Sequence, residues 1–399
     1  MAVILPPAAW RERPGIAELV AALGQARFVG GAVRDTLLGL PVSDVDLATP
    51  LEPPEVVRRL QAAGIKAIPT GIAHGTVTAV SHGAVVEVTT LRRDVATDGR
   101  HAVVAYTDSW HEDAARRDFT INALYAEPLN GRVDDFFGGL ADLEARRVRF
   151  IGDPLRRIAE DHLRILRFFR FHARFGETVD ADGLAACTAR ANDLMALSRE
   201  RVAAELLKLL VAPRAVETVA LMIARGIFVP VLPEITDGGR LVDLAKTEIA
   251  AGIAPDPIRR LAALLPRDPA MAESVAARLK LSKAQRQRLV LALTDRAGTP
   301  WEDAYRHGRD AAIDRFLLCN DGDAPRGLLE WPIPRLPIGG GALVGRGLTA
   351  GPAVAAALKR IEDQWVAEEF PSSSRVEAIA DAVVGAMMLQ ADSASSGRA

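Results

Sequence analysis

One stretch decides the fold of the first part of this chain: Val29-Gly30-Gly31-Ala32-Val33-Arg34-Asp35. The apolar residues before the glycine pair predict a short buried strand, and the residues from Gly31 to Leu38 predict a helix. Glycine lets a backbone approach a phosphate closely, and a helix N-terminus offers free N–H donors. Gly30 and Gly31 are therefore candidate phosphate-binding residues, and Arg34, one turn into the helix, could donate to the same phosphate.

Three carboxylates follow this turn. Asp44 directly precedes a predicted strand at 45–48 and Asp46 lies within it, so the two share one face, where they repel each other unless a cation lies between them. A solvated strand edge is the alternative interpretation. Glu87 interrupts an apolar β run, so it needs either a cation or a salt bridge to an arginine. Oxygen ligands suit Mg²⁺, and the three carboxylates together predict a two-metal phosphoryl-transfer site with Asp44, Asp46 and Glu87 as catalytic residues.

The remaining pattern predicts an α+β fold, in which a mixed-sheet domain is followed by an extended all-helical region. A helix is expected at 54–63, a hairpin at 76–80 and 84–90, and a polar loop without regular structure at 91–111. Beyond Pro154 strand signals nearly vanish. We expect four parts, at residues 1–150 (catalytic domain), 151–240 (helical nucleotide and RNA binding), 241–390 (helical body and tail, binding RNA) and 391–399 (frayed tail).

The composition is that of an ordinary globular protein and excludes several classes. Of 399 residues, 49% are hydrophobic and 25% charged, which excludes collagen-like and broadly disordered chains. No apolar run is long enough for a transmembrane helix. Two cysteines, Cys187 and Cys319, are too few for a disulfide framework and indicate a cytoplasmic protein. The net charge of -2 does not by itself indicate a nucleic-acid binder.

Arginines are concentrated between Glu144 and Phe175, a range that contains nine arginines and four acidic residues. From Arg164 to Arg170 they recur every third residue, which places them on one helical side as a solvated basic face or as a surface for triphosphate or RNA. Asp161 and Arg164, three residues apart, could pair with each other. Alternatively, the carboxylate could accept from an exocyclic amino group while the guanidinium donates to the adjacent ring nitrogen. That arrangement would accept cytosine and adenine and reject uracil and guanine.

The chain resembles the class II nucleotidyltransferases, which comprise CCA-adding tRNA nucleotidyltransferases and bacterial poly(A) polymerases. The resemblance covers about the first 180 residues well and the helical remainder loosely. It rests on four motifs in order: Gly30-Gly31-Ala32-Val33-Arg34-Asp35 with Asp44-Val45-Asp46; Glu87-Val88-Thr89-Thr90; Arg116-Arg117-Asp118-Phe119-Thr120-Ile121-Asn122-Ala123-Leu124; and Glu160-Asp161-His162-Leu163-Arg164.

The resemblance implies a role for each motif. Asp44 and Asp46 would hold Mg²⁺, and Glu87 would complete the acidic cluster. The residues expected to bind the nucleotide are Gly30, Gly31, Arg34, Arg117, Asp118, Asn122, Asp161, Arg164, Arg167 and Arg170. Among these, Asp161 and Arg164 would read the base, Arg167 and Arg170 would lie near the phosphates, and Asn122 would lie near the sugar.

The resemblance also implies the reaction. The 3′-hydroxyl of tRNA would attack the α-phosphorus of CTP or ATP and release pyrophosphate. Members that add only two cytidines lack a flexible loop whose place residues 92–101 occupy here, so complete CCA addition is favoured. Poly(A) polymerase activity is the alternative, although the short Ser-rich tail differs from the long basic tails of such enzymes. A non-catalytic RNA-binding scaffold and a small-molecule nucleotidyltransferase fit less well, and no protein partner is inferred.

Overall fold

The computed structural model describes residues 3–72, 75–97, 102–295 and 298–396. The chain divides into two compact units, Met1–Gly238 with Arg278–Leu281 and Gly239–Ala277 with Ser282–Ala399. The domain limit expected at 240/241 lies close to the end of the first unit, whereas that at 150/151 falls inside it. His74, which belongs to a His-Gly-Thr segment for which we expected a turn or loop-anchoring role, lies outside the described residues.

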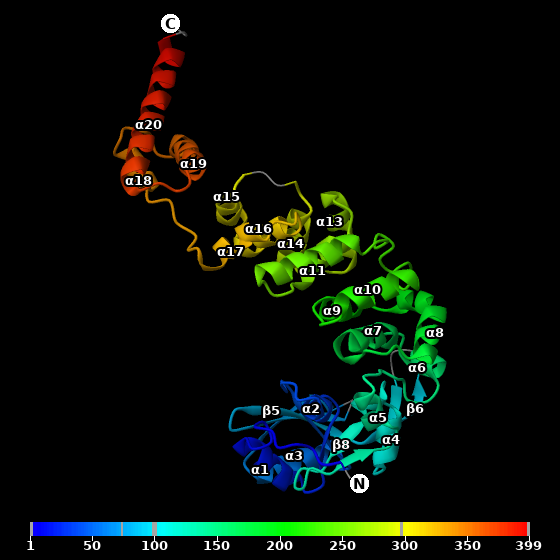
Figure 1. Ribbon diagram of the computed structural model, residues 1–399. Coiled ribbons are helices and arrows are strands. Elements are labelled where there is room, and N and C mark those ends of the chain that lie inside the picture. Colours follow the sequence, from blue (N-terminus) through cyan, green and yellow to red (C-terminus); the bar gives the residue numbers. More distant parts are fainter. Residues whose placement is uncertain (1–2, 73–74, 98–101, 296–297, 397–399) are drawn as a thin grey trace. The chain divides into compact units, whose positions relative to one another are not determined.

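In the described part of the first unit, seven strands form a mixed sheet in the order β3-β4-β5-β2-β1-β8-β9 (Figure 1). The strands are β1 (Arg27–Val29), β2 (Val45–Thr49), β3 (Lys66–Gly71), β4 (Thr76–Ser81), β5 (Ala84–Thr90), β8 (Leu124–Ala126) and β9 (Val133–Asp135). β2 and β5 run parallel, with Asp46 opposite Glu87, and the other neighbours are antiparallel. The strands expected around Phe28, at 45–48 and in the 76–90 hairpin are confirmed.

Helices complete this part of the unit. They are α1 (Pro14–Leu23), α2 (Gly31–Leu37), α3 (Pro53–Ala62), α4 (Trp110–Ala115) and α5 (Gly139–Glu144), with a short 3-10 helix η2 (Thr120–Asn122). α1 packs against β4 and α3, and α3 packs against β3. The core between these helices and the sheet contains fully buried Leu19, Phe28, Leu47 and Leu60. This packing fixes β2, so the acidic residues near its start have a rigid support.

The prediction of a loop without regular structure at 91–111 is wrong in part. Most of this range forms a two-stranded sheet of β6 (Arg92–Thr97) and β7 (Ala102–Tyr106), and residues 98–101 lie outside the described part of the chain. An antiparallel pair satisfies its backbone hydrogen bonds irrespective of side-chain polarity, so the weak apolar alternation concealed these strands.

The second part of the first unit is helical. It contains α6 (Pro154–Glu160), α7 (Arg164–Phe175), α8 (Ala181–Ala189), α9 (Arg199–Leu210) and α10 (Ala215–Ala224). α7 packs against both α9 and α10 and buries Phe168 and Phe169 completely. The arginine-bearing segment is not one continuous helix, because α6 ends before Asp161. The Asp161 carboxylate accepts a hydrogen bond from the backbone N–H of Leu163 at 3.1 Å, a local contact that competes with helix continuation.

The second unit consists of helices in its described part. They are α11 (Gly239–Ala251), α12 (Pro257–Leu264), α13 (Pro269–Arg278), α14 (Lys283–Ala292), α15 (Pro300–His307), α16 (Arg309–Leu317), α17 (Asp323–Glu330), α18 (Gly340–Val344), α19 (Pro352–Ala367) and α20 (Ser373–Ser396). Since α20 extends to Ser396, helix covers most of the range 391–399 for which we expected fraying. No helix among the described residues combines the length and the apolar character needed to cross a bilayer.

Asp314 of α16 forms ion pairs with arginines of two other helices of the second unit, α12 and α14. Its fully buried carboxylate accepts from Arg288 of α14 at 2.5 and 2.8 Å and from Arg259 of α12 at 3.3 Å. A buried carboxylate with two guanidinium partners is costly to disrupt, because removal of one charge leaves the others uncompensated.

Candidate nucleotidyl-transfer site

The glycine turn between β1 and α2 forms the floor of the site. Gly30 has φ +67°, which disfavours any side chain, and a Cβ atom there would lie 3.5 Å from Nη1 of Arg117 and 3.6 Å from the carbonyl of Asn122. A Cβ atom on Gly31 would lie 3.7 Å from Nη2 of Arg34. The structure therefore brings together five predicted residues, Gly30, Gly31, Arg34, Arg117 and Asn122.

Arg34 is buried rather than projecting freely toward a ligand. Its Nε donates to Asp35 at 2.8 Å and its Nη1 donates to Oδ1 of Asn122 at 2.5 Å. The guanidinium also lies 4.3 Å from the ring centre of Phe175. Burial lowers the pKa of Arg34 despite the neighbouring Asp35 carboxylate. Arg34 thus joins the glycine turn to α7 and is oriented by Asn122, itself a predicted site residue, and by Asp35 and Phe175, for which the sequence predicted no role in the site.

Asp46 is the most perturbed carboxylate of the site. Burial, followed by the charges of Glu87 and Asp44, raises its pKa to about 6, while Arg117 acts in the opposite direction. Glu87 and Asp44 are therefore close enough to Asp46 to repel its charge, and Arg117 is close enough to attract it. This repulsion is the physical signature expected of oxygen ligands around a cation.

The three carboxylates are nevertheless not gathered as tightly as we expected. Among the described residues there is no group of three or more acidic, histidine or cysteine side chains close enough to hold a metal ion. Asp44 is exposed, and its Oδ2 accepts from the hydroxyl of Ser43 at 2.8 Å. Glu87 is also exposed, so the premise that it is a buried charge was wrong. Like charges repel, and exposed side chains are free to turn apart.

A divalent cation nevertheless fits the donors present. Mg²⁺ commonly takes one or two protein carboxylates and completes its shell with water and substrate phosphate oxygens. Asp46 and Asp44 supply such a pair beside a turn that suits phosphate, and the raised pKa of Asp46 indicates that a positive charge there would be favourable.

Arg117 is held by two residues that sequence reasoning missed. Its Nη2 donates to Asp113 at 3.2 Å and its Nε donates to the hydroxyl of Tyr125 at 3.1 Å. The same hydroxyl donates to Asp113 at 2.6 Å, which closes a triangle of hydrogen bonds. Asp113 and Tyr125 are almost fully buried. The available signal in the sequence for Asp113 was its place three and four residues before Arg116 and Arg117.

Asp118 connects the sheet domain to α7. Its Oδ1 accepts from Nδ2 of Asn122 at 3.0 Å and from the backbone N–H of Phe119 at 2.8 Å. Its Oδ2 accepts from Nε of Arg167 at 2.7 Å. Burial alone would raise the pKa of Asp118, but Arg167 and these hydrogen bonds outweigh burial and lower it. Asp118 therefore orients two other predicted residues, Asn122 and Arg167.

Each arginine of the expected row on α7 has a carboxylate partner. Arg170 donates to Glu205 of α9 at 2.5 Å, and Arg167 lies 3.9 Å from the other oxygen of Glu205. Arg174 lies 3.3 Å from Asp35. Of the two interpretations, a face solvated without protein partners is therefore not what the structure has, although Arg174 is exposed. Glu205, which is nearly buried, was missed in the sequence, although a glutamate between the apolar positions of an amphipathic helix could have indicated it.

The two residues expected to read the base do not pair with each other. Asp161 binds Arg201 of α9, with 2.9 Å between Oδ2 and Nη2. Arg164 donates to Glu160 at 2.6 Å and to the backbone carbonyls of Arg157 and Arg116. The alternative of a local Asp161–Arg164 ion pair is therefore not observed in the structure.

Comparison with known proteins places this geometry in a family. Residues 26–149 match the family described as "Poly A polymerase head domain", and residues 178–238 match "Probable RNA and SrmB- binding site of polymerase A". The sheet domain is thus a nucleotidyltransferase head domain, and nucleotidyltransferases of this family generally depend on a divalent metal ion.

Relatives that are similar over most of their length show which family of nucleotidyltransferases the chain belongs to. The chain is 34% identical to the mouse "CCA tRNA nucleotidyltransferase 1, mitochondrial", with 86% of this chain and 82% of the relative aligned. It is 32% identical to the "CCA-adding enzyme" of Limosilactobacillus fermentum, with 89% and 92% aligned. The Bacillus stearothermophilus CCA-adding enzyme, solved in complex with CTP, matches with a TM-score of 0.67 at 28% identity, covering 90% of this chain and 94% of that one. The chain belongs to the family of CCA tRNA nucleotidyltransferases.

Proposed function

We propose that this protein adds C, C and A to the 3′ end of tRNA, using CTP and ATP and releasing pyrophosphate. One observation carries the proposal: Asp46 lies opposite Glu87 on adjacent parallel strands, and Arg117, beside the Gly30 turn, is close enough to act on the charge of Asp46. Acidic groups, a phosphate-suited turn and an arginine thus meet at one place. The names of the relatives favour CCA addition over poly(A) synthesis.

The chemistry follows from this arrangement. The oxygen of the RNA 3′-hydroxyl forms a bond to the α-phosphorus of the nucleotide, and the bond from that phosphorus to the oxygen of the leaving pyrophosphate breaks. Asp44 and Asp46, with Glu87 beside them, would hold Mg²⁺ as a two-metal site, which when bound supplies positive charge to the attacking and leaving oxygens. The Gly30–Gly31 turn lets the triphosphate approach the backbone, and Arg117 orients it.

Base selection would be the work of Asp161 and Arg164. Asp161 offers acceptor oxygens to an exocyclic amino group, and Arg164 offers donors to a ring nitrogen or carbonyl oxygen. Cytosine and adenine both present an amino group beside an acceptor nitrogen, so one pair of side chains suits both nucleotides. Arg167 and Arg170, each held by an acidic partner, would exchange part of those contacts for phosphate oxygens.

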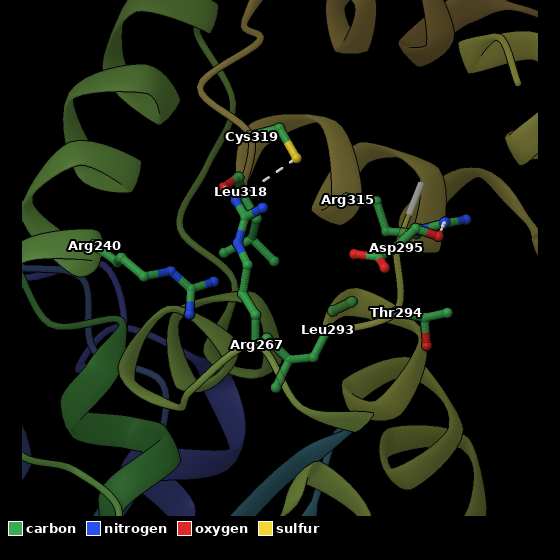
Figure 2. Close-up of a pocket in the computed structure, with 9 residues that line it drawn as sticks. Arg240, Arg267, Leu293, Thr294, Asp295, Arg315, Leu318 and Cys319 are labelled. Atoms are coloured by element: carbon green, nitrogen blue, oxygen red, sulfur yellow. Dashed lines mark hydrogen bonds between the residues drawn. The ribbon is translucent and has the colours of Figure 1, made fainter. Parts of the chain in front are cut away.

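We also propose that the second unit binds the RNA backbone. Arg240 and Arg267 line a small cavity of about 30 Å³ together with Asp295 and Cys319. Figure 2 shows the side chains of these residues. Arg240 donates to the carbonyl of Leu265 and Arg267 to that of Leu318, and among the described residues neither lies within ion-pair distance of a carboxylate. Two adjacent guanidinium groups without an acidic partner favour a phosphate ligand.

This RNA-binding role can be tested by salt dependence. Arg240→Ala with Arg267→Ala should weaken tRNA binding and reduce the slope of log affinity against log salt by about 1 to 2. Lys246→Ala is the matched control, because Lys246 is exposed and already paired with Asp243. An unchanged slope in the double variant would rule out the contact.

The activity itself is tested with tRNA that lacks its 3′-terminal CCA. Incubation with Mg²⁺, CTP and ATP should lengthen the RNA by three nucleotides, and Asp46→Asn should abolish the reaction. Asp243→Asn, which removes an exposed carboxylate of α11, should leave it intact. Long A-tails formed from ATP alone would instead support a poly(A) polymerase.

A cytoplasmic location is proposed from the cysteine content. Cys187 and Cys319 are both free thiols, as expected in a reducing compartment. Fractionation of cells that express the chain would test this assignment.

A further inference from the structure

We propose that Arg201 is a positioning residue that sets base selectivity by keeping Asp161 and Arg164 apart. This inference rests on the proposed function, because it assumes that these two side chains read the base. Arg201 lies on α9, outside the motif that carries the pair, and nothing in its sequence position marks it for such a role.

The first observation is the way in which Asp161 is held. Its Oδ2 accepts from Nη2 of Arg201 at 2.9 Å, and its Oδ1 accepts from the backbone N–H of Leu163 at 3.1 Å. Each carboxylate oxygen has a second lone pair, so both remain able to accept from a ligand. The side chain of Asp161 is 30% exposed, which leaves it accessible. The carboxylate is therefore fixed in orientation and still available.

The second observation is that Arg164 has a separate set of partners. Its Nη1 donates to Glu160 at 2.6 Å and to the carbonyl of Arg157 at 2.9 Å, and its Nη2 donates to the carbonyl of Arg116 at 3.1 Å. Its side chain is only 12% exposed. The guanidinium is thus directed by acceptors that do not include Asp161.

These separate partners have a consequence for recognition. Asp161 lies in the turn between α6 and α7, three residues before Arg164, the first residue of α7, so that opposite charges at these two positions attract each other over a short distance. If Asp161 and Arg164 paired with each other, the acceptor and the donor would neutralise each other and neither would face the base. Arg201 compensates the Asp161 charge from a different helix, and so removes the drive toward that local pair. Without Arg201, Asp161 would turn toward Arg164, and the distinction between an amino group and a carbonyl oxygen would weaken.

The α9 helix carries a second contact of the same kind, one turn further along. Glu205 binds Arg170 at 2.5 Å and lies 3.9 Å from Arg167. One helix thereby orients both the base-reading carboxylate and the arginines expected near the phosphates. Arg201 contacts the base-reading Asp161. Its replacement should therefore change the choice of base more than the overall affinity for triphosphate.

The test measures equilibrium binding of CTP, ATP, UTP and GTP to the full chain, together with incorporation into tRNA lacking CCA. Arg201→Ala should reduce the preference for CTP over UTP by about tenfold, within the range for loss of one good hydrogen-bonding pair. Arg201→Lys retains the charge and should restore most of the preference. Lys208→Ala, an exposed cation on the same helix, should leave the preference unchanged.

The possible outcomes separate the two proposals. If Arg201→Ala binds all four nucleotides more weakly but with the wild-type ratios, Arg201 has only a structural role and the inference is wrong. If that variant does not fold, as judged by circular dichroism, Arg201→Gln replaces it, and unchanged ratios there would equally overturn the inference. If the wild-type chain incorporates no nucleotide into tRNA, the proposed function fails instead, while the binding ratios still report on Arg201.

Discussion

The substitution Asp118→Asn tests most directly how the site is held together. Asp118 accepts on both oxygens, from Asn122 and Phe119 on one side and from Arg167 on the other. An asparagine has one acceptor oxygen and one NH₂ donor. If its oxygen faces Arg167, its NH₂ group meets the N–H donors of Asn122 and Phe119; if it is flipped, the NH₂ group meets Arg167. One set of donors is therefore unsatisfied in either orientation.

The expected cost is about 2 kcal/mol of unfolding free energy. Loss of a partner in a buried ion pair costs about 3–5 kcal/mol, but the side chain of Arg167 is 31% exposed and can be rehydrated, which reduces the penalty. The free energy of unfolding is measured by urea denaturation, with tryptophan fluorescence and circular dichroism as probes. The control is Asp108→Asn, because Asp108 is exposed. Asp135→Asn is unsuitable, because Asp135 accepts hydrogen bonds from several backbone N–H groups.

The pH dependence sharpens this test. The folded-state pKa of Asp118 is lowered from its ordinary value of 3.8, so the ionised form is favoured by folding. Its contribution to stability is fully present above pH 3.8 and is lost as the pH falls through the folded-state pKa. The difference between wild type and Asp118→Asn should be constant from pH 7 to pH 5 and shrink below about pH 4. A difference below about 0.5 kcal/mol at pH 7 would refute the reasoning.

The structure makes four other predictions. Asp46 has a pKa raised to about 6, so divalent-cation affinity, measured by titration with Mn²⁺, should fall as the pH drops through 6, and a flat profile between pH 5 and pH 8 would contradict this. The same shift means that the unbound protein loses stability as the pH rises through about 6, so Asp46→Asn should raise the free energy of unfolding above that pH by about 1 kcal/mol. Gly30→Ala should cost about 1 kcal/mol or more, because φ is +67°, and it should raise KM for nucleotide; an unaltered KM would show that the turn does not meet the substrate. Asp314→Asn, which leaves Arg259 and Arg288 undercompensated, should destabilise the second unit by about 3 kcal/mol without changing the ratio of CTP to UTP binding.

Local sequence signals predicted the parts of the fold that local physics determines. The glycine pair predicted the turn from strand to helix, because glycine accepts the positive φ angle found at Gly30. Alternating apolar residues predicted β4 and β5, which are joined by the turn at His82 and Gly83. The short strands β8 and β9 were missed, since three residues carry too little periodicity to be distinguished from a loop.

The partners of the site residues could not be predicted in the same way. Arg34 meets Asn122, Asp118 meets Arg167, and Arg170 meets Glu205 across long separations in sequence. Spacing rules describe neighbours on one helix or strand and say nothing about such pairs. The same limit explains why the sequence left the arginine face open between a solvated surface and a ligand-binding one, because the carboxylates that pair with Arg167, Arg170 and Arg174 come from other elements.

Glu205 also has a consequence for the order in which the protein matures. A chain emerging from the ribosome folds from its N-terminus, and the head domain, with Gly30, Asp46 and Arg117, is exposed long before residue 205 has been synthesised. Until α9 emerges, Arg170 lacks its acidic partner, and Asp161 lacks Arg201. A nascent chain halted before α9 would therefore carry the acidic residues of the reaction centre but not the ordered surface that selects among nucleotides.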